Sequence, residues 1–391
     1  MPDLTYGEAE NELRDAVRSV IADRADWPAV LSRTESDDTY DMRLWRTLAA
    51  EVGCAGLLVP EAHGGAGASY REAAVVAEEI GRAAAPVPYL GSAVLATAAL
   101  LCVAGASGAG DGLSEADELL LAELAAGTTT AALAVPFATM PGARTAPTVR
   151  VGPSADGDAE GTYRLSGAVL GVAEALPADV LLVPADGVPY GLYVVSAAEA
   201  GVASVPVVSL DMTRQLCDLT LTGVPARRLA GGAMAEQAVA EALLAGAAML
   251  AAEQVGLAEA ALEITLAYVK QRHQFARPVG SFQAVKHRLA DLWVAVTQAR
   301  AASRYAAACL ATSDPDTAVA VALAKAACSD TAVKAGQEMV QLHGGIGFTW
   351  EHPAHLYLKR AKSGSIGLGT ADRHRAALAA LVNLPPAGAG T

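Results

Sequence analysis

Apolar residues recur at three- and four-residue intervals through the first third of the chain, which places them on one face of an α-helix. Residues 11–27 (NELRDAVRSVIADRADW) and residues 71–84 (REAAVVAEEIGRAA) both have this spacing, and Pro86 stops the second segment. A turn-rich segment, GLLVPEAHGGAG, connects them at residues 56–67. We therefore predict a helical domain over residues 1–128.

The pattern changes between residues 129 and 232, where short apolar runs are separated by Gly, Pro and Asp. Examples are TYRLSG at 162–167, DVLLVP at 179–184 and GLYVVS at 191–196. Runs of this length, bounded by turn residues, are typical of β-strands. Their spacing favours a β-sandwich or a small barrel.

The helical pattern returns at residue 233. It predicts one helix or two over residues 235–272, and further helices at 282–313, 316–342 and 371–382. Helices, then strands, then helices predict an α+β fold rather than a doubly wound sheet. We expect an N-terminal helical domain (1–128), a middle β-sandwich or barrel domain (129–232) and a C-terminal helical bundle (233–391).

The composition narrows the function classes. Hydrophobic residues make up 53 % of the 391 residues, enough for a large core, and the net charge is −14. Such an acidic chain is a poor partner for nucleic acid or for an anionic membrane surface. The five cysteines form no CxxC pair and the histidines form no HExxH motif, so we expect no metal site. Isolated thiols and an acidic, amphipathic N-terminus without signal-peptide features indicate the cytoplasm.

Two long segments carry the most specific signals. They are YVKQRHQFARPVGSFQAVKH at residues 268–287 and QLHGGIGFTWEHPAHLYLKRAK at residues 341–362. The first resembles the R-x-x-F-G-x-x-[IVL]-x-x-[FHY]-Q signature of the acyl-CoA dehydrogenase family, with Ala276 in place of the usual Gly. The second resembles that family's Q-x-x-G-G-x-G-[FY] signature. Residues 56–83 also resemble its N-terminal domain, so the resemblance covers essentially the whole chain.

The resemblance implies FAD-dependent oxidation of an acyl-CoA thioester between Cα and Cβ, with an electron acceptor such as electron-transfer flavoprotein. It also implies which residues contact FAD. Arg272 matches a residue on the pyrophosphate, because a guanidinium suits phosphate oxygens. The other matching positions are Phe275 and Gln283 on the adenine side, Gln341 on the adenosine diphosphate, Gly344 and Gly345 where the backbone approaches the dinucleotide, and Thr370.

The two ends of FAD are held differently in this family. Residues matching Arg272, Gln341 and Gly345 reach across a dimer interface to the adenosine end of the partner's FAD. The flavin ring is held mainly by the middle domain of its own subunit. In this chain Gly171 stands where the family has the Trp that covers the ring, and Ala173 where a Thr or Ser bonds it. Residues 135–142 likewise lack the family's T-E-P-x-x-G-S-D motif.

The family's catalytic Glu is also missing, so no catalytic residue is predicted. Most members place it just before Gly-Thr, where this chain has Leu368, and a minority place it at the position of Gly246. Glu253 lies on the same helix as Gly246 and is the remaining candidate. The competing interpretation, which the sequence favours, is that Glu253 makes a polar contact at a helix-packing surface.

One hypothesis explains both the retained and the lost residues. Some actinobacterial family members that this chain resembles are α₂β₂ heterotetramers, in which one subunit carries the Glu and the flavin pocket. The other subunit supplies the contacts across the interface, and this chain resembles that subunit. Its complex would desaturate a fatty acyl, steroid or polyketide-like thioester. The alternatives are a self-sufficient flavoenzyme with a relocated base and a non-enzymatic acyl-thioester-binding protein.

Overall fold

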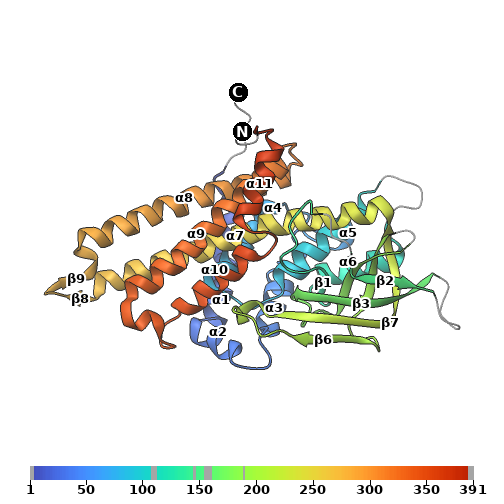
Figure 1. Ribbon diagram of the computed structural model, residues 1–391, viewed down its shortest axis with the longest axis horizontal. Helices are drawn as coiled ribbons and strands as arrows, with labels where there is room; N and C mark the ends of the chain where they lie inside the picture. The colour runs from blue at the N-terminus through green and yellow to red at the C-terminus, as the bar shows by residue number, and fades with distance from the viewer. Residues whose placement is uncertain (1–3, 107–111, 144–146, 154–160, 188–189, 386–391) are drawn as a thin grey trace.

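The computed structural model describes residues 4–106, 112–143, 147–153, 161–187 and 190–385. Helices at both ends of the chain flank a β-sheet unit, which confirms the predicted α+β fold. Figure 1 shows the sheet on one side of the molecule and the long C-terminal helices extending to the other. The helix α7 (Gly232–Gln271) runs between these two parts along most of the molecule.

The N-terminal third forms the predicted helices. Ser69 begins the best-defined one with a capping box, in which its hydroxyl accepts from the helix backbone and Glu72 bonds the Ser69 N–H. The helices are α1 (Glu8–Arg24), α2 (Trp27–Thr34), α3 (Met42–Arg46), α4 (Tyr70–Ala83), α5 (Thr97–Ala104) and α6 (Glu115–Ala125), with η1 (Thr47–Glu51), η2 (Glu61–His63) and η3 (Tyr89–Ala96) between them.

The described strands of the middle third form one curved sheet in the order β1-β4-β5-β7-β3-β2, with β6 also paired to β7. The strands are β1 (Ala131–Leu133), β2 (Val149–Gly152), β3 (Thr162–Ala173), β4 (Val180–Ala185), β5 (Gly191–Ser196), β6 (Val202–Pro206) and β7 (Leu216–Gly231), with η4 (Met212–Arg214) before β7.

The sheet curls back on itself, in agreement with the barrel form of the prediction. The Val151 N–H donates to the carbonyl of Asp186 (2.9 Å), and the Asp186 N–H donates to Val149 (2.8 Å), so β2 returns to the end of β4. Leu181 and Val183 point into the enclosed core, whereas Leu182 between them packs against the helices. This alternation is the period of two that a strand imposes.

The C-terminal third is helical. Its elements are α7, the hairpin β8 (His273–Gln274) and β9 (Arg277–Pro278), η5 (Val279–Ser281), α8 (Gln283–Ala311), α9 (Thr317–His343), η6 (Gly344–Phe348), α10 (Ala354–Ile366) and α11 (Ala371–Leu381). The segment predicted as one helix or two is therefore one helix of 40 residues. By length and composition α7 could cross a membrane, but 83 % of its most apolar window is buried inside the protein.

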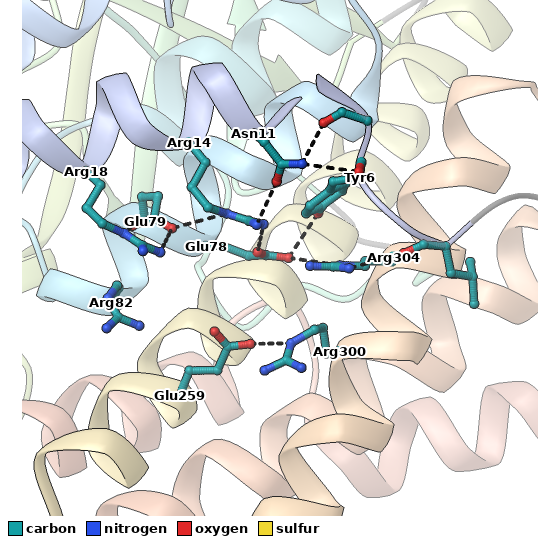
Figure 2. Close-up of polar contacts among 12 residues, drawn as sticks. Tyr6, Asn11, Arg14, Arg18, Glu78, Glu79, Arg82, Glu259, Arg300 and Arg304 are labelled. Atoms are coloured by element: carbon teal, nitrogen blue, oxygen red, sulfur yellow. Dashed lines mark hydrogen bonds and ion pairs between the residues drawn. The ribbon is translucent and has the colours of Figure 1, made fainter. Parts of the chain in front are cut away.

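Buried ion pairs on α4 fasten the N-terminal segment to the helical bundle (Figure 2). Glu78 accepts from the Tyr6 hydroxyl (3.0 Å) and from the Arg14 guanidinium (2.8 Å), and Arg304 of α8 lies 3.9 Å from it. Burial raises the pKa of Glu78, and the two arginines oppose that shift. Removing either arginine would therefore leave a buried carboxylate less compensated.

Two glycines allow α4 and α7 to cross at backbone contact. A Cβ on Gly256 would lie 1.8 Å from the carbonyl oxygen of Glu78, and one on Gly81 would lie 2.0 Å from that of Glu253. Any side chain at either position would push the helices apart. The crossing therefore fixes the place of α7, and with it the position of every C-terminal element.

We predict that Gly256→Ala lowers the free energy of unfolding by about 3 kcal/mol or more, because an overpacked contact with backbone cannot relax locally. Urea unfolding followed by circular dichroism measures this. Gly112→Ala is the control, since a Cβ there meets nothing within 4 Å. Equal stability of the two variants would show that α4 and α7 do not cross this closely.

Candidate functional site

The first signature segment spans the end of α7, the β8–β9 hairpin and the start of α8. Phe275 and Ala276 form the hairpin turn with φ values of +53° and +62°. Glycine adopts this left-handed region without strain, which explains why the family signature has Gly at the position of Ala276. The turn holds Phe275 in solvent, 86 % exposed.

The second signature segment ends α9 at the same end of the bundle. Gly344 terminates the helix with φ +62°, and η6 follows. The Tyr268 hydroxyl of α7 donates to the carbonyl of His343 (3.3 Å), and their rings stack at 4.3 Å. These contacts join the ends of α7 and α9, so the two signature segments meet in space although Tyr268 and His343 are 75 residues apart in the sequence.

Six of the seven predicted cofactor residues lie at this end and face solvent: Arg272, Phe275, Gln283, Gln341, Gly344 and Gly345. Within the described part of the chain, no hydrogen bond or ion pair engages the Arg272 guanidinium. A Cβ on Gly345 would meet nothing within 4 Å, so its backbone is open to a ligand. The adenosine diphosphate half of FAD can be bound by groups of these kinds: an unpaired guanidinium, side-chain amides, an accessible backbone and an aromatic ring.

A groove of about 540 Å³ lies beside these residues, between α7 and α8. Pro278, Leu289 and Trp293 line it, with Lys270 and Lys286. The sequence has no Asp or Glu between residues 264 and 290, so this segment is basic although the chain as a whole is acidic. Such a surface attracts a pyrophosphate.

Thr370 lies apart from the other six residues. It is partly buried before α11 and lines a different groove, between α9, α10 and the start of α11, with Lys334 and Lys362. The structure therefore does not bring all seven predicted residues into one site. This separation parallels the family pattern, in which this Thr contacts the cofactor beside the Glu position.

The positions that match the flavin end are closed by Phe137. Its N–H donates to the carbonyl of Gly171 (2.9 Å), and its carbonyl accepts from the N–H of Leu368 (2.7 Å). Its ring packs against Gly367, where an added Cβ would lie 2.2 Å away. Gly171 and Leu368 match the positions of the ring-covering Trp and the catalytic base. In space, the single residue Phe137 bridges Gly171 and Leu368 through its backbone hydrogen bonds. The residues at these positions therefore do not fit a flavin ring.

At both positions where family members carry the catalytic Glu, this chain has closely packed apolar residues. Leu368 is 1 % exposed, and a Cβ built on Gly246 would lie 3.1 Å from its Cδ1. The two alternative positions are thus neighbours in space, and neither carries a carboxylate. A leucine has no group that can accept a proton.

Glu253 is held as a buried structural ion. Arg214 bonds its Oε2 (2.5 Å) and Arg360 bonds its Oε1 (2.8 Å). Burial alone would raise the pKa of Glu253, but the two guanidinium charges outweigh it and lower the pKa to about 2. A carboxylate this acidic, with both oxygens engaged, is a poor general base.

Sequence reasoning missed the other members of this cluster. Arg214 also bonds Glu174 at 3.0 Å, and Arg360 donates to the carbonyl and the hydroxyl of Thr213 (both 2.9 Å). Burial raises the pKa of Glu174, against the charge of Arg214. The only available signal was the presence of single charges inside otherwise apolar runs, and charge alone does not say which residues pair.

A third, larger groove of about 790 Å³ lies between α7, α9 and α11. Leu244, Val321 and Ala377 make its walls apolar, and Arg373 supplies a cation. No group of three or more His, Cys, Asp or Glu residues in the described ranges could hold a metal ion. All five cysteines are free thiols.

Comparisons with known proteins show the family to which this chain belongs. Residues 7–107 match the model of the acyl-CoA dehydrogenase N-terminal domain, and residues 236–382 match that of the acyl-CoA dehydrogenase C-terminal domain. The chain is 36 % identical to acyl-CoA dehydrogenase IpdE2 of Mycobacterium tuberculosis over 362 residues, 92 % of each chain. The chain belongs to the acyl-CoA dehydrogenase family of FAD-dependent oxidoreductases.

Solved structures resemble it over nearly their whole length. A variant of the Tcur3481-Tcur3483 steroid ACAD is 31 % identical with a TM-score of 0.80, covering 97 % of this chain and 99 % of that one. The ChsE4-ChsE5 complex from Mycobacterium tuberculosis is 27 % identical with a TM-score of 0.83, covering 99 % and 100 %. Each name joins two different proteins, and the second is named as a complex.

We predict that Glu253→Gln lowers the free energy of unfolding by about 3–5 kcal/mol at pH 7, because it leaves buried guanidinium charge uncompensated. Glu263→Gln is the control: its half-exposed pair with Arg82 should contribute under about 1 kcal/mol.

Because the pKa of Glu253 is lowered in the folded state, its stabilisation is present above about pH 4.5 and is lost as the pH falls towards 2. Urea unfolding at several pH values tests both statements, and an unchanged midpoint for Glu253→Gln would contradict the structural role.

Proposed function

We propose that this chain is the partner subunit of a heteromeric acyl-CoA dehydrogenase. In this proposal it holds the adenosine half of FAD, while a homologous subunit holds the flavin ring and supplies the catalytic Glu. The observation that carries the proposal is the contrast between the two ends of the predicted cofactor site. The adenosine-side residues are exposed, and Phe137 closes the flavin side.

FAD bound in such a complex would accept the hydride from the β-carbon of the acyl thioester. This chain's own contribution would be binding and orientation: Arg272 on the pyrophosphate, and Gln283 and Gln341 as amide partners. A site completed by two subunits explains why Arg272 lacks a partner within the described part of this chain. An electron acceptor such as electron-transfer flavoprotein would reoxidise the complex.

The similarity to a steroid acyl-CoA dehydrogenase favours a bulky, steroid-like acyl-CoA as the substrate of the complex. The apolar groove between α7, α9 and α11 favours a second candidate function for the chain by itself, the binding of acyl thioesters without catalysis. Calorimetric titration of the isolated chain with acyl-CoA esters tests this second function. No heat of binding would exclude it.

We predict that the chain purified alone has little FAD and no acyl-CoA dehydrogenase activity. The reason is the closure at Phe137 and the apolar Leu368 at the base position. Absorbance near the flavin bands and dye-linked oxidation of acyl-CoA esters measure the two properties. Co-expression with a Glu-bearing homologue should restore both, and a yellow, active homo-oligomer would refute the proposal.

We predict that Arg272→Ala weakens FAD binding by the complex about 10- to 100-fold, because a charge-assisted hydrogen bond contributes roughly 1.5–3 kcal/mol. The flavin spectrum should stay the same, because the ring is held in the other subunit. Arg150→Ala, at an 81 % exposed side chain on β2, is the control. Unchanged FAD affinity of the Arg272→Ala complex would rule out the contact across the interface.

A further inference from the structure

The groove between α7, α9 and α11 has the size and the walls of a small-molecule site. Its volume is about 790 Å³. Ligand pockets usually have volumes of roughly 300–1,000 Å³ and walls that are mostly apolar. Leu244 of α7, Val321 of α9 and Ala377 of α11 supply apolar surface from three helices. We call the space that these three residues and Arg373 line the α11 groove.

Two charged side chains line the α11 groove, and they come from different helices. Glu241 of α7 is engaged, because its Oε1 accepts from the side-chain amide of Gln237 (2.8 Å). Arg373 of α11 is not: within the described part of the chain, no hydrogen bond or ion pair holds its guanidinium. The neighbouring Asp372 pairs with Arg375 instead (3.1 Å). Arg373 is therefore a free cation beside apolar walls.

The lining of the α11 groove carries no net charge. Its third titratable side chain is His374, whose Nε2 donates to the carbonyl of Leu368 (2.8 Å). Burial lowers the pKa of His374, so the ring is neutral at pH 7. The charges of Glu241 and Arg373 then cancel. The several phosphate charges of a CoA ester would find one cation here, whereas Arg373 matches a ligand with a single negative charge.

The two charges also determine how such a ligand would lie. Glu241 repels an anion on the α7 side, and Arg373 attracts one on the α11 side. A carboxylate is a suitable partner for a guanidinium, because the two form charge-assisted hydrogen bonds. The apolar body of the ligand then covers Leu244 and Val321. Removal of this surface from water would supply most of the affinity.

We propose that the α11 groove binds a free, apolar monocarboxylic acid, such as a fatty acid or a steroid acid, with its carboxylate on Arg373. The inference goes beyond the partner-subunit function and does not depend on it. It replaces the acyl thioester of the second candidate function with the free acid. The chain would thus bind an uncoupled acid at a site distinct from the residues proposed to contact FAD.

Calorimetric titration of the isolated, full-length chain tests the ligand class. Dodecanoate should bind below its micellar concentration, and dodecanol and dodecanoyl-CoA should bind at least about tenfold more weakly, because the first lacks the charge and the second has too much of it. Lithocholate, a steroid acid, distinguishes the two sources. Tighter binding of lithocholate than of dodecanoate supports a fused-ring ligand, and weaker binding supports an open chain.

Three variants test the place of binding. Arg373→Gln should weaken dodecanoate binding about tenfold, since it removes a charge-assisted hydrogen bond. Arg375→Gln is the matched control, because Arg375 lies on the same helix but is paired with Asp330 and Asp372. Ala377→Phe fills the α11 groove and should abolish binding of dodecanoate. Circular dichroism and thermal melting of each variant show that the fold is intact.

Four results would overturn the inference. They are no binding of dodecanoate or lithocholate to the wild-type chain, equal affinity for dodecanol and dodecanoate, equal or tighter binding of dodecanoyl-CoA, and unchanged binding by folded Arg373→Gln or Ala377→Phe. Tight binding of dodecanoyl-CoA would support the second candidate function instead. The partner-subunit function is tested separately by the FAD occupancy of the Arg272→Ala complex, so the two can fail independently.

Discussion

The backbone of Phe137 is the constraint on which this account depends. Hydrogen bonds to Gly171 on one side and Leu368 on the other hold it between the positions that match the family's ring-covering Trp and catalytic Glu. A ring system and this residue cannot occupy the same place. One cause then explains why this chain lacks the Trp, the hydroxyl at the position of Ala173 and the Glu. Without a flavin ring, none of these side chains would have a group to contact.

The closed site lies in a rigid framework. Arg214 and Arg360 join the β domain, α7 and α10 through Glu253, and all of these groups are buried. Ion pairs of this kind add little net stability over apolar packing, but removing one partner is costly. Together with the α4–α7 crossing they fix the relative positions of the domains. The exposed cofactor residues at the C-terminal end of α7 are therefore held in place by this rigid framework.

The sequence was sufficient where the signal was local. Periodicity predicted α4, α8, α9 and α11 to within two residues of their observed ends, because each helix buries one regular face. It left α7 as one helix or two, since a helix that is apolar on every side has no period to follow. The return of β2 to β4 depends on contacts distant in sequence and was not predictable beyond a choice between sandwich and barrel.

For the site, the sequence resemblance named seven residues without their positions in space; the structure brings six of them to one end of the bundle and has Thr370 elsewhere. Phe137, Arg214 and Arg360 were not singled out, because their roles come from partners far along the chain.

The most direct test of the account is the FAD content of the purified wild-type complex with its Glu-bearing homologue. We predict one FAD for every two chains, bound in the homologue. One FAD per chain would show that the pocket beside Phe137 opens, and would contradict the account.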